Sequence, residues 1–124
     1  MHLKHLNLCV ADVPIAQAFF ERYFAFRFVQ VQQESGHVVL EGADGFALVL
    51  SPADTMSPPV YPGRFHIGFI VSNHDALMAM YEKMLAEGVE VVREPETFGF
   101  GTAFYAKTPG GIVFEITALA PAAN

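Results

Sequence analysis

Two histidines and one glutamate have residue types and positions that suit a divalent metal ion. His5 and His66 each lie in a segment with alternating apolar residues, and Glu115 stands between Phe114 and Ile116. A carboxylate among apolar neighbours is unfavourable unless a positive group compensates it. Two imidazoles and one carboxylate that meet around an ion leave coordination positions open for substrate, which is typical of Fe(II), Mn(II) and related ions.

Each of these residues also has an ordinary explanation. A histidine near the end of a strand is more often hydrogen-bonded or solvated than bound to a metal. The metal hypothesis therefore depends on the segments that position the three side chains, and a metal-free pocket is the alternative.

The first half of the chain predicts a βαβββ unit. Residues 3–10 alternate in polarity, so His5 and Asn7 share the strand face opposite the apolar side chains. Asp12 is a suitable N-cap for a helix that continues to about Phe24. Three β-rich runs separated by turn sequences follow, at residues 27–33, 36–41 and 46–51.

The second half predicts the same order after a linker over residues 53–63. Prolines in and beside the linker disfavour regular structure there, because each lacks an N–H donor and restricts the residue before it: Pro52, Pro58, Pro59 and Pro62. A strand at 64–71 follows, then a helix at 75–87 capped by Ser72 or Asn73 and closed by Gly88, then strands at 89–93, 102–108 and 112–118. We therefore expect one domain over residues 1–124, with a first module of about 1–52 and a second of about 64–120.

A shift of 61 residues superimposes the two halves. It keeps residue class or role at five positions: His5 onto His66, Val10 onto Val71, Asp12 onto Asn73, Phe19 onto Met80 and Phe20 onto Tyr81. A matching cap, helix phase and strand phase indicate an internal duplication. The two histidines occupy equivalent places in the repeat, which favours a common site.

Composition excludes several classes of partner. The net charge of -6 and seven scattered Lys and Arg residues argue against nucleic acid and anionic lipid. We expect a cytoplasmic protein without a membrane span, because the apolar runs are short, Cys9 is the single cysteine and no secretory signal is evident. A hydrophobic content of 52% with 16% charged residues predicts a homodimer interface.

Three segments of the sequence are informative together: HLNLCVADV at residues 5–13, HIGF at 66–69 and TPGGIVFEI at 108–116. They resemble the glyoxalase, bleomycin-resistance and dioxygenase superfamily, also called the vicinal oxygen chelate (VOC) superfamily. The resemblance covers nearly the whole chain and implies an α+β fold of two tandem βαβββ modules whose curved mixed sheets form a cup. It places His5, His66 and Glu115 where family members have metal ligands, and it places Val49 at the first-half counterpart of Glu115.

The implied ligand set discriminates among the activities of the superfamily. Glyoxalase I-like enzymes use four protein ligands, two of them carboxylates, so Val49 counts against that activity unless a group such as Glu41 approaches. Extradiol dioxygenases and fosfomycin-modifying thiol transferases use two histidines and one glutamate, which agrees with this chain. Tyr105 aligns with a tyrosine that hydrogen-bonds substrate beside the metal in both groups, although it could equally be an ordinary strand tyrosine.

Neither of those two activities fits completely. Asn7 stands where fosfomycin-modifying enzymes carry threonine, no arginine follows Glu115, and the loop expected at 94–101 has no cation beyond nearby Arg93. Classical ring-cleaving dioxygenases usually have two such domains and an extra histidine base, for which His37 and His74 remain.

The expected cup also has candidate substrate-contacting residues. We assign Asn7, Val49, Phe98 and Phe100 to the substrate pocket. Aromatic residues around the cup would suit a flat or apolar small molecule, although such residues are more often core: Phe46, Tyr61, Phe65, Phe98, Phe100, Phe104 and Tyr105. Gly99 and Gly101 around Phe100 fit either a mobile lid or a glycine-flanked hairpin.

The leading hypothesis is a metal-dependent enzyme that acts on a small oxygen-chelating substrate, with dioxygenase, lyase or isomerase chemistry. Fe, Mn, Ni or Zn would be held by His5, His66 and Glu115, with His5 drawn from the same or a partner chain, and would act as a Lewis acid. Tyr105 would orient substrate or donate a proton. The alternatives are a metal-free drug-binding protein of the bleomycin-binding type, a fosfomycin-type thiol transferase and an inert member of the superfamily.

Overall fold

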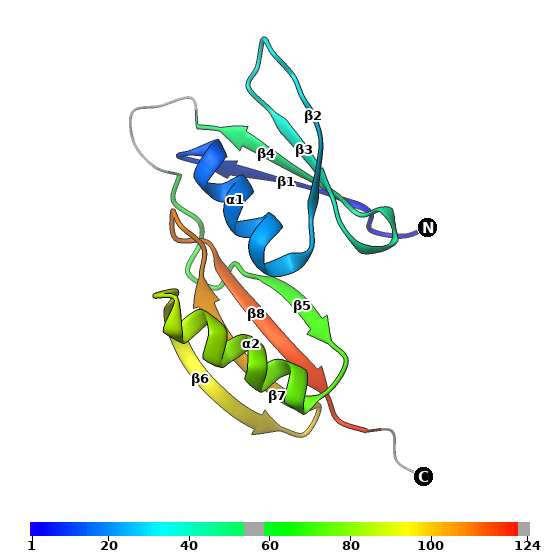
Figure 1. The fold of residues 1–124 in the computed structure, drawn as a ribbon, viewed down its shortest axis with the longest axis vertical. Helices are drawn as coiled ribbons and strands as arrows, with labels where there is room; N and C mark the ends of the chain where they lie inside the picture. Colours follow the sequence, from blue (N-terminus) through cyan, green and yellow to red (C-terminus); the bar gives the residue numbers. More distant parts are fainter. Residues whose placement is uncertain (54–58, 122–124) are drawn as a thin grey trace. The chain divides into compact units, whose positions relative to one another are not determined.

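The computed structural model describes residues 1–53 and 59–121, and it consists of two compact units, Met1–Val60 and Tyr61–Asn124. Each unit has one helix and one four-stranded mixed sheet, as the predicted tandem βαβββ fold requires (Figure 1). Residues 54–58 of the predicted linker lie outside the described residues. The organisation of the two units as one domain stays a prediction.

The first unit contains a sheet in the order β1-β4-β3-β2, in which β1 runs parallel to β4 and the other neighbours are antiparallel. A short 3-10 turn, Ala43–Gly45, connects β3 and β4. The elements are β1 (His5–Val10), α1 (Val13–Phe24), β2 (Arg27–Val31), β3 (Val38–Glu41) and β4 (Ala47–Pro52).

The second unit repeats this plan with the order β5-β8-β7-β6, and β5 runs parallel to β8. Its elements are β5 (Ile67–Val71), α2 (His74–Ala86), β6 (Glu90–Phe98), β7 (Gly101–Lys107) and β8 (Val113–Leu119). His66 precedes the first residue of β5, whereas its counterpart His5 is the first residue of β1.

Strand register and helix capping both agree with the predicted duplication. Asn7 pairs with Val49 between β1 and β4, and Gly68 pairs with Glu115 between β5 and β8. The side chains of Asp12 and Asn73 cap the two helices by accepting hydrogen bonds from the N–H three residues on, at 3.0 and 2.8 Å. Val49 is therefore the structural counterpart of Glu115.

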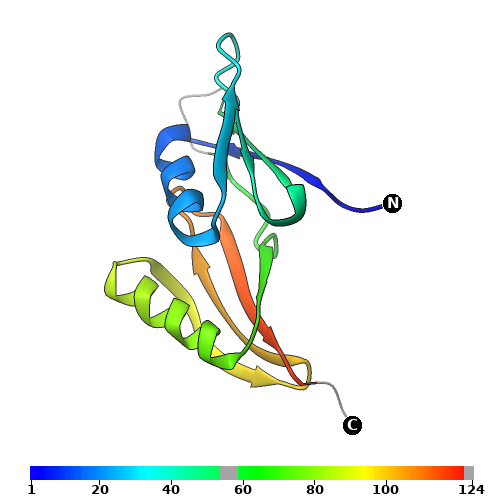
Figure 2. The same ribbon diagram turned by 45° about the vertical axis from the view of Figure 1, so that its right-hand side comes forward.

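One face of each sheet is covered by the helix of the same unit (Figure 2). The side chains between helix and sheet are almost fully buried, including Phe20, Leu40 and Leu50 in the first unit and Leu77, Phe114 and Ile116 in the second. Strand alternation sends the neighbouring residues, such as Glu115, to the opposite face.

The sequence suggests that Phe104 borders a ligand pocket, but in the structure it lies in the core. Its side chain is fully buried, and its ring meets that of Tyr81 on α2 edge-on at 5.3 Å. Because Tyr105 and Phe104 are neighbours on a strand, they face opposite sides of the sheet, and Phe104 belongs to the core.

Strand β6 is longer than the sequence predicts. The expected loop over 94–101 is mostly strand, since β6 continues to Phe98 and turns at Gly99 and Phe100 into β7. Pro95 is tolerated because β6 is an edge strand whose register shifts between Arg93 and Glu96. The glycine-flanked segment is thus a hairpin.

In the described part of the chain, neither helix has the length and apolarity that a membrane span requires.

Candidate functional site

His66 and Glu115 form the centre of the candidate site in the second unit. His66 Nε2 lies 3.2 Å from Glu115 Oε2. The glutamate side chain is 18% exposed and the histidine side chain 42% exposed, so ligands could reach a carboxylate that is largely screened from water. Both residues were predicted as metal ligands from the sequence, and the structure brings them together.

The other nitrogen of His66 fixes the orientation and tautomer of the ring. Nδ1 lies 3.0 Å from the carbonyl oxygen of Arg64, and a carbonyl can only accept, so Nδ1 carries the proton and donates. In the neutral ring, Nε2 then presents its lone pair toward Glu115. Metal-binding histidines commonly have this arrangement, with the second N–H donated to a carbonyl.

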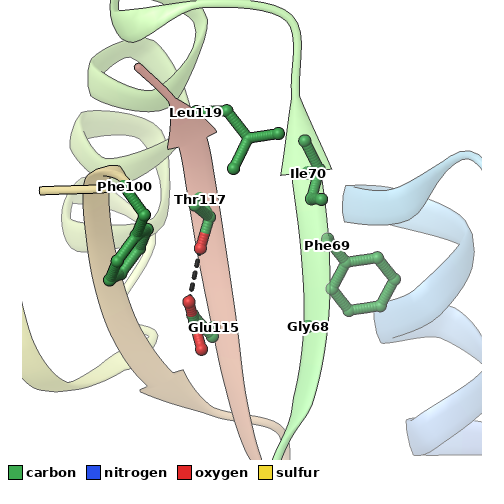
Figure 3. Close-up of a pocket in the computed structure, with 7 residues that line it drawn as sticks. All are labelled: Gly68, Phe69, Ile70, Phe100, Glu115, Thr117 and Leu119. Carbon is green, nitrogen blue, oxygen red and sulfur yellow. Dashed lines mark hydrogen bonds between the residues drawn. The ribbon is translucent and has the colours of Figure 1, made fainter.

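The two oxygens of Glu115 have different partners. Oε2 faces His66, whereas Oε1 accepts a hydrogen bond from the Thr117 hydroxyl at 2.5 Å. Thr117 lies two residues along the same strand and therefore on the same face (Figure 3). The threonine thus holds the carboxylate in one orientation with Oε2 toward the histidine.

Tyr105 completes the cluster. It pairs directly with Glu115 across β7 and β8, and its ring meets the imidazole of His66 edge-on with centroids 5.7 Å apart. Burial raises the pKa of Tyr105 above 10.0, and so do the hydrogen bond to Glu115 and the negative charge of that carboxylate, while the charge of Arg93 acts in the opposite direction. The phenol is therefore neutral at neutral pH and can donate a hydrogen bond.

An open pocket of about 280 Å³ adjoins the carboxylate. Figure 3 shows Glu115 and Thr117 along β8, with the ring of Phe100 on one side, Ile70 of β5 on the other and Leu119 farther along β8. The lining is Gly68, Phe69, Ile70, Phe100, Glu115, Thr117 and Leu119. Phe98 stacks on Phe100 with centroids 5.3 Å apart and lines a different pocket, next to the start of α2.

The remaining predicted site residues lie on the first unit. His5 is exposed at the start of β1, and Asn7 accepts a hydrogen bond from the Ser51 hydroxyl at 2.6 Å. Val49 is half-buried beside Asn7, and Glu41 forms an ion pair with Arg27 at 3.0 Å. The place of His5 in a common site with His66 and Glu115 stays a prediction.

Within residues 1–53 and 59–121, no group of three or more His, Cys, Asp or Glu side chains has the proximity of a metal-binding set. The cluster that the structure does provide, entirely within the second unit, is His66, Glu115, Tyr105 and Thr117.

Comparison with known proteins assigns the family. The family model described as Glyoxalase/Bleomycin resistance protein/Dioxygenase superfamily matches residues 2–116. The chain belongs to this superfamily. No curated protein matches the sequence.

Solved structures of the glyoxalase superfamily share both the fold and, in one case, substantial sequence. A possible glyoxalase from Bacillus cereus is 32% identical, with a TM-score of 0.80 over 94% of this chain and 98% of that one. The fosfomycin resistance protein FosX from Listeria monocytogenes is 23% identical, with a TM-score of 0.78 over 97% and 94% of the two chains. A lactoylglutathione lyase from Agrobacterium tumefaciens is 17% identical, with a TM-score of 0.74 over 94% and 92%. The last two show likeness of fold alone.

Sequence reasoning did not assign a role to Thr117, Ile70 or Leu119. Strand alternation would have been enough to predict two of them, because Thr117 and Leu119 lie on the same face of β8 as Glu115. Ile70 shares the parity of Gly68, the strand partner of Glu115.

Proposed function

We propose that the chain is a metal-dependent enzyme in which His66 and Glu115, with His5, hold a divalent ion that binds two neighbouring oxygens of a small substrate. The observation that carries this proposal is the 3.2 Å approach of His66 Nε2 to Glu115 Oε2, with the opposite edge of each group fixed by a hydrogen bond. Fe, Mn, Ni and Zn are the candidate ions.

The donor set fits a metal by its spacing and its chemistry. Two ligand atoms each about 2.1 Å from an ion and at roughly right angles lie about 3 Å apart, close to the observed separation. Imidazole suits Zn, Fe and Ni, and a carboxylate adds the negative charge that divalent ions favour. The backbone carbonyl of Arg64 and the hydroxyl of Thr117 are the supporting partners that metal ligands usually have.

The ion would act as a Lewis acid that polarises the substrate oxygens. Tyr105 would donate its phenolic hydrogen to a substrate oxygen in exchange for its hydrogen bond to Glu115, since its raised pKa keeps the donor protonated. Phe100, Ile70 and Leu119 would exclude water from the apolar part of the substrate. Isomerase and lyase reactions would use this polarisation, whereas a dioxygenase would also need a redox-active ion such as Fe(II).

Metal titration tests the proposal directly. Protein purified without chelator is expected to contain a divalent ion, and metal-free protein is expected to melt at higher temperature when Mn, Fe(II), Ni or Zn is added. An ion at about one hundred times its dissociation constant adds about 2.7 kcal/mol to the free energy of unfolding. The measurements are elemental analysis and thermal denaturation.

Variants locate the effect at the proposed ligands. His5→Ala, His66→Ala and Glu115→Gln should each remove the metal-dependent rise in melting temperature. His74→Ala is the matched control, because His74 is exposed at the start of α2 and makes no contact in the cluster. A wild-type protein that none of the four ions stabilises would contradict the proposal.

Metal-free binding of an apolar ligand is the second candidate, and the stacked rings of Phe98 and Phe100 beside an open apolar pocket favour it. A proton on His66 Nε2 would then satisfy Glu115 in place of an ion. This candidate predicts that aromatic ligands raise the melting temperature equally in wild-type and His66→Ala protein, without added metal.

A further inference from the structure

An irregularity in β6 places one arginine on the face that carries the candidate site. Val91 pairs with Ala106 and Arg93 pairs with Tyr105, so Val92 is an extra residue in β6. In a strand without this bulge, Arg93 would lie opposite Phe104, whose side chain is fully buried under α2. The bulge instead directs Arg93 to the face of Tyr105 and Glu115, and bulges are frequent beside functional sites for this reason.

Strand pairing then arranges four residues in one row across the sheet. Arg93 pairs with Tyr105, Tyr105 with Glu115, and Glu115 with Gly68. Because neighbouring strands are about 4.8 Å apart, the backbones at Arg93 and Glu115 are roughly 10 Å apart. A small molecule of a few carbon atoms could contact the arginine at one end and approach the His66–Glu115 pair at the other.

A second pocket of about 260 Å³ lies at the arginine end of this row. It is lined by Gly63, Val92, Arg93, Tyr105 and Val113. Arg93 supplies the strongest hydrogen-bond donor of this pocket. Among the described residues, its side chain forms one ion pair, in which Nε lies 3.9 Å from Glu96 Oε2 and both side chains are more than half exposed. Such a pair contributes little, so the guanidinium is available to a ligand.

We propose that this pocket binds a carboxylate group of the substrate through Arg93, and that the substrate is therefore a small carboxylic acid whose other end carries the two neighbouring oxygens. This inference rests on the proposed function, since the neighbouring oxygens are those that the His66–Glu115 site would bind. Arg93 would then determine specificity for acids over neutral analogues.

A carboxylate fits better than a phosphate or phosphonate. The planar guanidinium fork matches the two oxygens of a carboxylate. A dianion would need more positive charge than Arg93 alone provides, because the carboxylate of Glu96 lies 3.9 Å from Arg93 and that of Glu115 acts on the neighbouring Tyr105. Lys107 on the neighbouring strand β7 is paired with Glu90 at 3.3 Å.

The test measures binding of pyruvate, its neutral methyl ester and inorganic phosphate to ¹⁵N-labelled, metal-free protein from which chelator has been removed. Pyruvate at tens of millimolar should shift the Arg93 Nε–H resonance, and the ester and phosphate should bind more weakly. Arg93→Gln should weaken pyruvate binding about ten-fold or more, the loss expected for a charge-assisted hydrogen bond. Arg93→Lys should weaken it less, because lysine keeps the charge without the fork.

Lys107→Gln is the matched control, because it removes one positive charge from the same sheet and should change pyruvate binding less than two-fold. The proposal is wrong if pyruvate leaves Arg93 unshifted, if Arg93→Gln binds pyruvate as well as wild type, or if the ester or phosphate binds as tightly. Metal titration of Arg93→Gln separates the two proposals, since the variant should keep the metal-dependent rise in melting temperature. If the wild-type protein binds none of the four ions, the proposed function is wrong whatever the pyruvate result.

Discussion

At the scale of single residues, the two oxygens of Glu115 have different partners. Thr117 donates to Oε1, which leaves Oε2 directed at His66. Rotation of the carboxylate would break the threonine contact, so the orientation is set before any ligand arrives. Pre-orientation of this kind lowers the entropy lost on binding.

Thr117→Val tests that support. Valine keeps the branched shape and removes the hydroxyl, so we expect metal affinity to fall by about 10–100-fold, the usual effect of losing a group that holds a ligand. Isothermal titration of Mn or Zn into the metal-free variant measures the change. Thr117→Ser should keep most of the affinity, and equal affinity in the valine variant would show that the hydroxyl contributes nothing.

The ionisation of Tyr105 gives a second test at this scale. The pKa of Tyr105 is raised by burial, by its hydrogen bond to Glu115 and by the charge of that carboxylate. Glu115→Gln removes the negative charge, so deprotonation becomes easier and the pKa of Tyr105 should fall. Ultraviolet titration of metal-free protein measures the shift. The curve of the matching Tyr105→Phe protein is subtracted in each case, because it contains the signal of the other three of the four tyrosines. An unchanged pKa would contradict the contact.

Residue alternation was sufficient to predict much of the site. The parity of β8 and the repeat position of His66 placed both residues on the face opposite the helix, where the structure brings them together with Tyr105. Alternation could not predict the role of Arg93. The bulge at Val92 moves Arg93 to the other face of the sheet, and no residue type in the sequence indicates a bulge at that position.

At the scale of elements, the β6–β7 hairpin carries Phe98 and Phe100 to the edge of the pockets. The turn is pinned by a hydrogen bond from the N–H of Ala120 to the carbonyl of Phe100 at 2.8 Å. Gly101 lies against β8, where an added Cβ would be 2.1 Å from the carbonyl oxygen of Ala118. Its φ of +147° also disfavours any other residue.

Gly101→Ala should therefore destabilise the protein by about 2–4 kcal/mol, through backbone strain and a clash that β8 must move to relieve. Urea denaturation measures the loss. Gly99→Ala is the matched control from the same turn, because a Cβ there would meet no atom within 4 Å. Equal stability of the two variants would contradict the packing of the hairpin against β8.

Elements were predicted more accurately than their ends. The eight strands and two helices were expected in the observed order, because alternation, N-caps and turn residues are local signals. The extension of β6 to Phe98 was not expected, since Pro95 normally marks the end of a strand. Pro95 is tolerated because it lies on an edge strand at a register shift. Both features depend on how the strands pair, which the local sequence does not indicate.

At the scale of the whole molecule, the two units share a plan and differ in chemistry. The row Gly68, Glu115, Tyr105 and Arg93 in the second unit corresponds to Asn7, Val49, Val39 and Gln30 in the first. The first unit thus has two valines where the second has a carboxylate and a phenol. The proposed function assigns one ligand, His5, to the first unit.

We expect the chain to form a homodimer. Phe28, Val29 and Val31 on the edge strand β2 are each more than 40% exposed, which agrees with the high hydrophobic content of the sequence. Size-exclusion chromatography with light scattering should give twice the chain mass of 13.6 kDa. A single-chain mass at micromolar concentration would contradict this prediction.

Mixing two inactive variants determines whether a site uses residues of both chains. If His5 comes from the partner chain, each heterodimer of His5→Ala and His66→Ala contains one intact site of two. Refolding an equal mixture makes half of the dimers heterodimers, so about one quarter of the wild-type metal binding returns. If each chain supplies its own His5, the mixture binds no more metal than either variant alone.

The strand register that makes Val49 the structural counterpart of Glu115 has an evolutionary consequence. Valine and glutamate codons can differ by a single base, and Val49 already has the strand position and the neighbour Asn7 that correspond to Glu115 and Gly68. One point mutation could thus give the first unit a carboxylate where the second already has one, so ancestors or descendants of this sequence could pass between one-acid and two-acid sites without any change of fold.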